Sequence, residues 1–342
     1  MSESWLKNRL YQVKIKSLGV ASLKELGQLM VQLQRQAFRK AYGKIWDITM
    51  AEVSTEAIAS LVQYYDQPLR DPGMPSGRKE VVSFLRELDR GKQVENGVVG
   101  VPRKCLEAKA RVLASQDEWA PFVDILALLI FGVVLFPNVD GLVDRATIDA
   151  FLAFYDRKES PVVAILADLY DTFDRRCEKN NTRIVCCTPT LYVWLVSYFF
   201  RQEMRHVCPL EGHRSCTKKK EANWDRLLVS KEGASVNWFP RWKERRTEIL
   251  ISCGKFPNVP LMGTRGCINY NPVLAIRQLG YPMRGAPSEE GLTPFITRGF
   301  NSTNVGVLQR VHKAWEMSQR KDKELRGSGN GPIGGYHRWL KA

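Results

Sequence analysis

The stretch Ile125-Leu-Ala-Leu-Leu-Ile-Phe-Gly-Val-Val-Leu-Phe136 is the most apolar part of the chain, and Asp124 and Pro137 bound it. It falls short of the roughly 20 apolar residues that cross a bilayer. Twelve apolar residues in a row that cannot span a membrane need a protein interior. The sequence therefore predicts a buried helix at about 120–136 at the centre of the fold.

Similar periodic segments follow this helix along the chain. Apolar residues recur at helical spacing, separated by short polar stretches, and Thr188-Pro189 is typical of a helix start. Further helices are expected at about 145–156, 161–177 and 189–204, and a long charged helix at 305–325. The predicted fold class is mainly α, either all-α or α+β with a few short strands. It has a helical core and an irregular, basic C-terminal half.

The N-terminal part of the chain also shows helical periodicity. Apolar side chains recur every three or four residues over 22–42, which predicts one amphipathic helix there. Ser54 is expected to cap a second helix, and Pro102 to begin a third. The members of the apolar stripe over 22–42 are Leu23, Leu26, Leu29, Met30, Leu33 and Phe38.

The distribution of proline and glycine divides the chain into four parts. Three prolines and two glycines fall within 67–77, which neither a helix nor a central strand can pass through. The expected organisation is an N-terminal helical segment (1–66), a linker or deletion scar (67–78), a main helical region (79–326) and a flexible glycine-rich tail (327–342).

Charge is distributed unevenly between the two halves. Residues 201–342 contain 25 Lys/Arg against 12 Asp/Glu, a net +13, whereas residues 1–200 contain 26 against 24, a net +2. Such an asymmetry favours a polyanionic partner, with nucleic acid first and an acidic protein or membrane surface behind it. The alternative is an ordinary solvated basic face.

The start of the chain and its cysteines indicate an intracellular protein. Residues 1–9 lack the apolar core of a secretory signal, so export is not expected. The eight cysteines are spread through the chain without the dense spacing of a disulfide framework. Reduced thiols are therefore expected, and those at Cys186, Cys187 and Cys253 are expected to be buried, because no catalytic base accompanies them in a motif.

Several segments resemble the plant mobile domain. Leu128-Leu-Ile-Phe-Gly-Val-Val-Leu-Phe-Pro-Asn, Val163-Ala-Ile-Leu-Ala-Asp-Leu-Tyr, Leu191-Tyr-Val-Trp-Leu and Tyr270-Asn-Pro-Val-Leu-Ala-Ile-Arg-Gln-Leu-Gly-Tyr look like its successive core segments. The likeness runs from about residue 38 to 340 and is strongest to a legume branch related to transposons and retrotransposons. It implies a nuclear protein without an established reaction. The family's "aminotransferase-like" label has no counterpart here, because no lysine has a pyridoxal-phosphate context.

The resemblance breaks at one place. Where the family continues from a helix like Ala59-Ser-Leu-Val-Gln-Tyr-Tyr-Asp into a short β segment and a further helix, this chain turns to Asp71-Pro-Gly-Met-Pro. The β segment and that helix are missing from the sequence. An internal deletion can leave apolar faces uncovered, so a degenerate copy without retained function is one hypothesis.

Two sets of residues have the chemistry of a metal or catalytic site. His206, Cys208, His213 and Cys216 fall within eleven residues and could hold zinc, although paired Cys-x2-Cys spacing is absent. The alternative is a surface loop with ordinary thiols. Asp168, Asp171 and Asp174 could bind the two metal ions of a nuclease, but helical periodicity predicts that they form the solvent-facing side of a helix buried through Leu166, Leu169, Tyr170 and Phe173.

Basic residues alternate with aromatic ones in the C-terminal half. Cations can neutralise phosphates while aromatic faces stack on unpaired bases, although Trp238 and Trp242 are more readily explained as core anchors. The candidate nucleic-acid-binding residues are Lys218, Lys219, Lys220, Arg241, Lys243, Arg245, Arg246 and Arg338.

Three functions follow as hypotheses. The first is a non-enzymatic, mobile-element-derived nuclear module that binds nucleic acid or nuclear proteins through its basic half. The second is a nuclease or transposase-accessory enzyme, and the third is a degenerate copy. No catalytic residue is assigned, because phosphate loops, Rossmann glycines and hydrolase or zincin motifs are absent from the sequence. Neither a cofactor, apart from the zinc considered above, nor a small-molecule substrate nor a membrane partner is expected.

Overall fold

The computed structural model describes residues 13–63, 93–95, 97–179, 181–199, 224, 226, 228, 249–275, 289–293, 295–300 and 304–321. Within these ranges the chain is mainly helical, with short antiparallel strands, in agreement with the predicted fold class. The helices are α2 (Ala21–Leu29), α3 (Gln32–Tyr42), α4 (Ile45–Thr49), α5 (Thr55–Gln63), α7 (Arg103–Ser115), α8 (Trp119–Ile130), the π-helix η2 (Phe131–Leu135), α9 (Arg145–Arg157), α10 (Val162–Glu178), α11 (Thr188–Phe199), α14 (Pro272–Ala275), α15 (Glu289–Leu292) and α16 (Val305–Glu316).

The strands form three small antiparallel sheets. Strands β1 (Gln93–Glu95), β2 (Val98–Pro102) and β3 (Leu142–Asp144) make one sheet, in that order. Strands β4 (Ile249–Cys253) and β8 (Ser318–Lys321) pair in a second, with a register shift between Leu250 and Ser252. Strands β5 (Val259–Met262), β6 (Gly266–Tyr270) and β7 (Ile296–Arg298) make the third.

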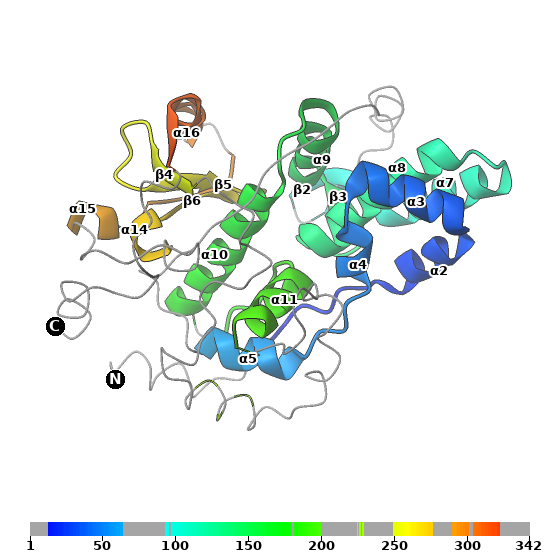
Figure 1. Cartoon of the computed structure of the whole chain (residues 1–342), viewed down its shortest axis with the longest axis horizontal. Helices are drawn as coiled ribbons and strands as arrows, with labels where there is room; N and C mark the ends of the chain where they lie inside the picture. Colours follow the sequence, from blue (N-terminus) through cyan, green and yellow to red (C-terminus); the bar gives the residue numbers. More distant parts are fainter. Residues whose placement is uncertain are drawn as a thin grey trace.

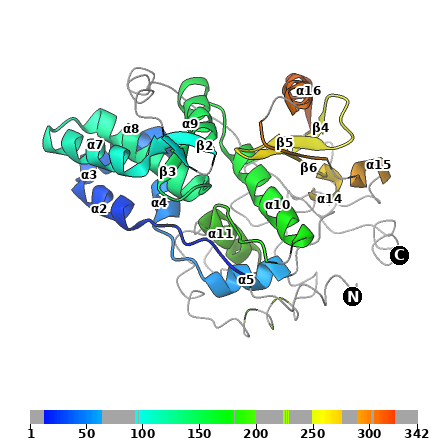
Figure 2. The same ribbon diagram turned by 180° about the vertical axis from the view of Figure 1, so that it is seen from behind.

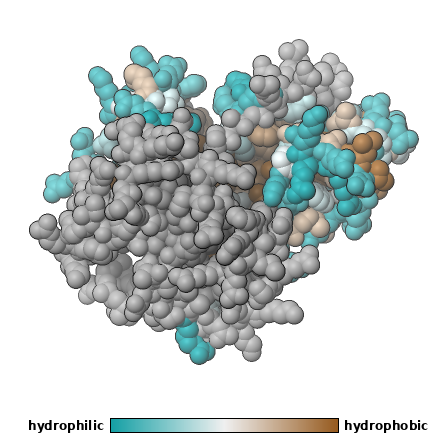
Figure 3. All heavy atoms as spheres, in the orientation of Figure 1, coloured by the Kyte–Doolittle hydropathy of each residue, from teal (hydrophilic) through white to brown (hydrophobic). Residues whose placement is uncertain are grey.

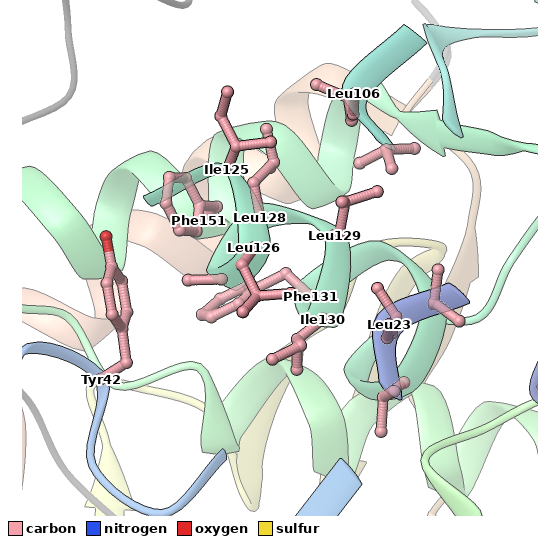
Figure 4. Close-up of a cluster of buried hydrophobic side chains, with 14 of the residues drawn as sticks. Leu23, Tyr42, Leu106, Ile125, Leu126, Leu128, Leu129, Ile130, Phe131 and Phe151 are labelled. Carbon is pink, nitrogen blue, oxygen red and sulfur yellow. The ribbon is translucent and has the colours of Figure 1, made fainter. Parts of the chain in front are cut away.

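The apolar stretch 125–136 forms the centre of a helical lobe, as predicted. Every residue from Ile125 to Phe136 is buried, first in α8 and then in η2. Helices α2, α3, α4, α7 and α9 surround it on the right of Figure 1. Figure 4 shows side chains from α8, together with Leu23 and Phe151, gathered in this core. We call it core cluster 1.

Two tyrosine hydroxyls bind the carboxylate of Asp124 at the edge of core cluster 1. The Tyr42 hydroxyl donates a hydrogen bond of 2.5 Å to Asp124 Oδ1, and the Tyr155 hydroxyl donates one of 3.4 Å to Asp124 Oδ2. Burial raises the pKa of the Asp124 carboxyl, and the two hydroxyl donors partly oppose that rise. Desolvation and the neighbouring carboxylate likewise raise the pKa of Tyr42, so this hydroxyl keeps its proton and serves as the donor.

The single helix expected over 22–42 is two helices, so that prediction is wrong in its continuity. Met30 and Val31 have extended backbone (ψ 124° and 179°) and separate α2 from α3. Leu23, Leu26, Met30 and Phe38 are buried as expected. The change of direction leaves the other two members of the apolar stripe, Leu29 and Leu33, 41% and 71% exposed.

Most of the other predicted helices begin within two residues of their expected positions. Ser54 Oγ accepts a hydrogen bond from the amide of Ala57, which confirms the predicted cap of α5. Asp144 caps α9 in the same way, through a 2.7 Å bond from the amide of Thr147. Helix α16 begins at Val305 as predicted, but it ends at Glu316 and the chain continues as β8. The helix predicted over 305–325 is therefore too long.

Helix α10 lies between the helical lobe, which includes β2 and β3, and the sheets formed by β4–β8, as Figures 1 and 2 show from opposite sides. Its Ile165 joins core cluster 1, and its Phe173 joins core cluster 2, which includes Ile58, Tyr192 and Trp224. Its Ala167 and Tyr170 join core cluster 3, formed mainly with strands β4, β5 and β6. One helix thus contributes to all three clusters.

The segment before α2 is fixed by contacts with distant residues. The amide of Lys16 donates to the Ile184 carbonyl at 2.9 Å, and the Ile184 amide donates to the Lys14 carbonyl at 2.7 Å. The Lys16 ammonium, whose side chain is 7% exposed, forms an ion pair of 2.9 Å with Asp140. These contacts hold residues 14–16 against the segment that leads into α11. Among the described residues, no helix has the length and apolarity needed to cross a membrane.

Candidate functional site

The densest group of charged side chains in the described residues lies between α10 and the β5–β6–β7 sheet. Asp168, Asp171 and Asp174 are 5%, 7% and 0% exposed. The prediction that these aspartates form a solvent-facing side of the helix is therefore wrong. Both sides of α10 are covered, one by core cluster 2 and the other by the sheet, so a helix that looks amphipathic is buried around most of its circumference.

Asp168 is held by the turn that joins β5 to β6. Oδ1 accepts a hydrogen bond of 2.9 Å from the amide of Thr264, and Oδ2 accepts one of 2.5 Å from the Thr264 hydroxyl. The turn requires glycine at two positions, Gly263 for the approach to Asp168 and Gly266 for the approach to β7. A Cβ at Gly263 would lie 2.2 Å from Asp168 Oδ1, and a Cβ at Gly266, where φ is +146°, would lie 2.0 Å from the Thr297 carbonyl oxygen.

Arg265, from the same turn, lies between two of the carboxylates. Its Nε is 3.8 Å from Asp168 Oδ1 and 3.7 Å from Asp171 Oδ2. Its Nη2 donates to the Asp168 carbonyl oxygen at 2.5 Å and to the Thr172 hydroxyl at 2.6 Å. The guanidinium therefore joins successive turns of α10 to the sheet.

Asp171 is shared by two further arginines. Arg298 of β7 donates from Nε to Oδ1 at 3.0 Å, and Arg175 of α10 donates from Nε to Oδ2 at 2.8 Å. Arg298 also reaches Glu178 Oε2 through Nη1 at 2.8 Å. We refer to Asp168, Asp171, Glu178, Thr264, Arg175, Arg265 and Arg298 together as the carboxylate–arginine network.

The electrostatics of the network indicate a structural role for it. Burial raises the pKa of the Asp168 carboxyl, while the Arg265 guanidinium and the Thr264 donors oppose that rise. Both oxygens of Asp168 accept hydrogen bonds from Thr264, and these bonds fix the carboxylate against the turn. Among the described residues, no group of three or more His, Cys, Asp or Glu side chains is placed to hold a metal ion.

The cysteines considered as nucleophiles are buried, as predicted. Cys186 and Cys187 are each 1% exposed and Cys253 is 0% exposed. Burial raises the pKa of Cys253 to about 11 and that of Cys267 to about 12, and it raises the pKa of Cys186 and Cys187 as well. Because the thiolate is the nucleophilic form, these thiols are poorly suited to covalent catalysis at neutral pH.

Six of the eight described cations of the C-terminal half fall into two groups. Arg265 and Arg298 point inward to the network, whereas a second group is exposed on or next to α16 and β8. Helix α16 lies at the top left of Figure 3, where hydrophilic residues are exposed. The exposed cations there are Lys255, Arg310, Lys313 and Arg320.

The residues predicted to bind nucleic acid or metal lie outside the described ranges, as do the 67–78 segment and the glycine-rich tail. Trp224 is the one tryptophan near the predicted basic–aromatic segments that the structure describes, and it is a fully buried core anchor. The predicted nucleic-acid set is Lys218, Lys219, Lys220, Arg241, Lys243, Arg245, Arg246 and Arg338, and the predicted metal set is His206, Cys208, His213 and Cys216.

Sequence reasoning missed the carboxylate–arginine network. The available signal was the pair of glycines that flank Thr264-Arg265, because a short turn with glycine at both ends allows a close approach by another element. Nothing in the sequence connected that turn to the aspartates of α10, about 95 positions earlier.

A family model described as "Domain of unknown function (DUF7745)" matches residues 23–71 and 81–342. The chain belongs to this family. In the DUF7745 chain the matched residues include all of the carboxylate–arginine network and α16, and the unmatched residues 72–80 fall largely within the segment predicted as a linker or deletion scar. No curated protein and no solved structure matches the chain.

Proposed function

We propose that this DUF7745 protein is a non-enzymatic, mobile-element-derived nuclear module of the plant mobile domain type, which binds nucleic acid through its basic C-terminal half. The observation that carries the proposal is that some cations of that half are paired with carboxylates inside the protein, whereas others are exposed on its surface. Two described arginines, Arg265 and Arg298, are engaged by carboxylates of α10. Others, such as Arg310 and Lys313, are exposed one turn apart on α16.

The charge count supports the same proposal. Of the 25 Lys/Arg in residues 201–342, eight lie in described residues, with three acids, a net +5. The remaining 17 Lys/Arg and nine Asp/Glu add +8. A surface with this excess of cations attracts phosphates through long-range electrostatics and through the release of counterions. The eight described cations are Arg226, Lys255, Arg265, Arg298, Arg310, Lys313, Arg320 and Lys321.

The test is binding of the purified full-length chain to short single- and double-stranded DNA and RNA at stepped salt concentrations. We expect the logarithm of affinity to fall linearly with the logarithm of salt concentration. Lys313→Glu and Arg310→Glu are expected to weaken binding and flatten that slope. Lys104→Glu, an exposed cation of the helical lobe, is the control and should leave both unchanged.

Two outcomes would contradict this proposal. One is absence of binding at low salt by a folded sample, which would leave chromatin-associated proteins as the partner to search for. The other is an equal loss of binding in the Lys104→Glu control, which would show that the C-terminal half has no special role.

The contacts of the network argue against a nuclease or transposase-accessory enzyme. Two of the three carboxylates considered for such an enzyme, Asp168 and Asp171, accept hydrogen bonds from Thr264 and Arg298, and the third, Asp174, is fully buried. Metal-dependent cleavage of DNA by the purified chain, lost on Asp168→Asn in a variant that still folds, would revive that alternative.

A further inference from the structure

The corner between α2 and α3 exposes three apolar side chains within five residues. Leu29 is 41% exposed, Val31 62% and Leu33 71%. They are exposed because the backbone extends at Met30 and Val31, which buries Met30 and turns its neighbours outward. Figure 3 shows hydrophobic surface at the right-hand end of the molecule, where Figure 1 places the start of α3 and α7.

Helix α3 continues this surface. Only Phe38 and Tyr42 of its eleven residues are buried, so the helix rests on core cluster 1 by a narrow seam. At 100° per residue, the side directly opposite that seam carries Leu33, Gln36, Ala37 and Lys40, all exposed. The outward face therefore has an apolar side chain at its N-terminal end, Gln36 and the small Ala37 in its middle, and a basic side chain at its C-terminal end.

All charged side chains of α3 are cations, and Lys40 is the one that lies on this outward face. Helix α3 contains Arg35, Arg39 and Lys40 and no acidic residue, and exposed Lys44 follows it. Of the acids nearest in sequence, Glu25 pairs with Arg111 of α7 at 3.0 Å, whereas Asp47 pairs with Arg39 of α3 itself at 2.8 Å and offsets that cation. Residues 21–44 contain five Lys/Arg and one acid, a net +4.

We propose that Leu29, Val31, Leu33, Ala37, Lys40 and Lys44, named here the α3 surface, dock an acidic amphipathic helix of a partner protein. The charge complementarity specifies the acids of that partner, which would face Lys40 and Lys44. The exposed apolar residues specify the rest of the same docking face, because apolar side chains laid on Val31 and Leu33 remove them from water. The small side chain of Ala37 permits the two helices to approach closely.

A nucleic acid would satisfy only half of these features. Phosphates would pair with the cations but would leave Leu29, Val31 and Leu33 in contact with water, so binding would gain nothing from burying these side chains. The α3 surface is also distinct from α16, so the two interfaces can be tested separately with variants of the same chain.

The experiment measures fluorescence anisotropy of a labelled synthetic peptide about 16 residues long, in which one helical face carries leucines in one half and glutamates in the other half. A second peptide has the same composition in a scrambled order without that face. The full-length chain is expected to bind the first peptide and to bind the second at least about tenfold more weakly, the ratio that corresponds to about 1.4 kcal/mol.

Variants locate the site. Leu33→Ser and Lys40→Glu are both exposed changes that leave the core intact, and each is expected to weaken peptide binding about fivefold or more. The matched controls are Val305→Ser, an exposed valine at 44%, and Lys313→Glu, both on α16. They should leave the affinity unchanged.

Three results would overturn the proposal. They are equal binding of the two peptides, unchanged binding by Leu33→Ser and Lys40→Glu in samples with wild-type thermal unfolding, and binding of an oligonucleotide that depends on Lys40 but not on Leu33. The last would assign the surface to nucleic acid. None of these results affects the test with Lys313→Glu, so this proposal and the proposed function stand or fall separately.

Discussion

Gly263 lies where the turn between β5 and β6 comes closest to α10. A Cβ at this position would be 2.2 Å from Asp168 Oδ1, whereas a Cβ at Gly306, in the first turn of α16, would meet nothing within 4 Å. We expect Gly263→Ala to lower the free energy of unfolding by about 1–3 kcal/mol through overpacking. Gly306→Ala should raise it by up to about 1 kcal/mol. Chemical denaturation measures both, and equal effects would contradict the required close approach.

The buried carboxyl of Asp124 makes the stability of the native state depend on pH. Burial raises its pKa above the ordinary value of an aspartate, so the native state takes up a proton at a higher pH than the unfolded chain does. Wild type should therefore gain stability relative to Asp124→Asn as the pH falls from 7 through the native pKa, with the gain complete below the unfolded pKa. Denaturation of both proteins at several pH values measures this difference. A difference that does not change with pH would show that the carboxyl titrates alike in both states.

Residue-level prediction from sequence succeeded where the signal was local. The cap of α5 by Ser54 depends on residues close to it in sequence. The burial of Cys186, Cys187 and Cys253 follows from the average hydrophobicity of the side chain. The environment of Asp168 depends on a turn that approaches from about 95 positions away. Short-range periodicity places an aspartate on a side of a helix, but it does not say what packs against that side.

At the scale of elements, α10 and the β5–β6–β7 sheet are joined by the carboxylate–arginine network, and Arg265 is its central member. Removing this cation would leave Asp168 and Asp171 buried without part of the positive charge that offsets their negative charge. We expect Arg265→Met to destabilise the protein by about 3–5 kcal/mol. Arg145→Ala is the control, because the Arg145–Asp149 pair is more than half exposed and is worth about 0–1 kcal/mol.

Denaturation curves of the two variants supply the comparison. A loss in Arg265→Met no larger than that in Arg145→Ala would show that the network is dispensable for stability. If Arg265→Met is almost completely unfolded, its loss of stability exceeds about 5 kcal/mol. Arg298→Met, which removes a cation whose side chain is 30% exposed, should then show a smaller and measurable loss of stability.

Element boundaries were predictable to the extent that the chain itself sets them. The helices from α8 to α11 begin close to their expected positions, because long apolar runs and Thr188-Pro189 mark them in the sequence. The two failures have tertiary causes. Residues over 22–42 keep helical spacing although the backbone extends at Met30 and Val31, and the chain after Glu316 leaves its helix to pair with β4.

At the scale of the whole molecule, α10 makes three core clusters interdependent. Core cluster 1 contains Trp46 and Trp119, core cluster 2 contains Trp194 and Trp224, and core cluster 3 contains Trp315. Tryptophan fluorescence therefore reports on all three, and circular dichroism reports on the helices. We expect the two signals to give coincident denaturation curves.

Separate transitions would show that the clusters unfold independently in spite of α10. The absence of any cooperative transition would favour the hypothesis of a degenerate copy that does not fold. A single transition would leave that hypothesis without thermodynamic support and would make the stability measurements on the variants interpretable as two-state values.

The pairing of residues 14–16 with Ile184 has a consequence for synthesis. About 168 residues separate Lys16 from Ile184, and at roughly 5–20 residues per second a ribosome needs on the order of 10–30 s to add them. During that interval Ile15 has no bridge partner and Lys16 has no carbonyl at position 184 to bind. A segment that emerges early is therefore fixed late, and the nascent chain must keep it from misassociating until α11 begins to appear.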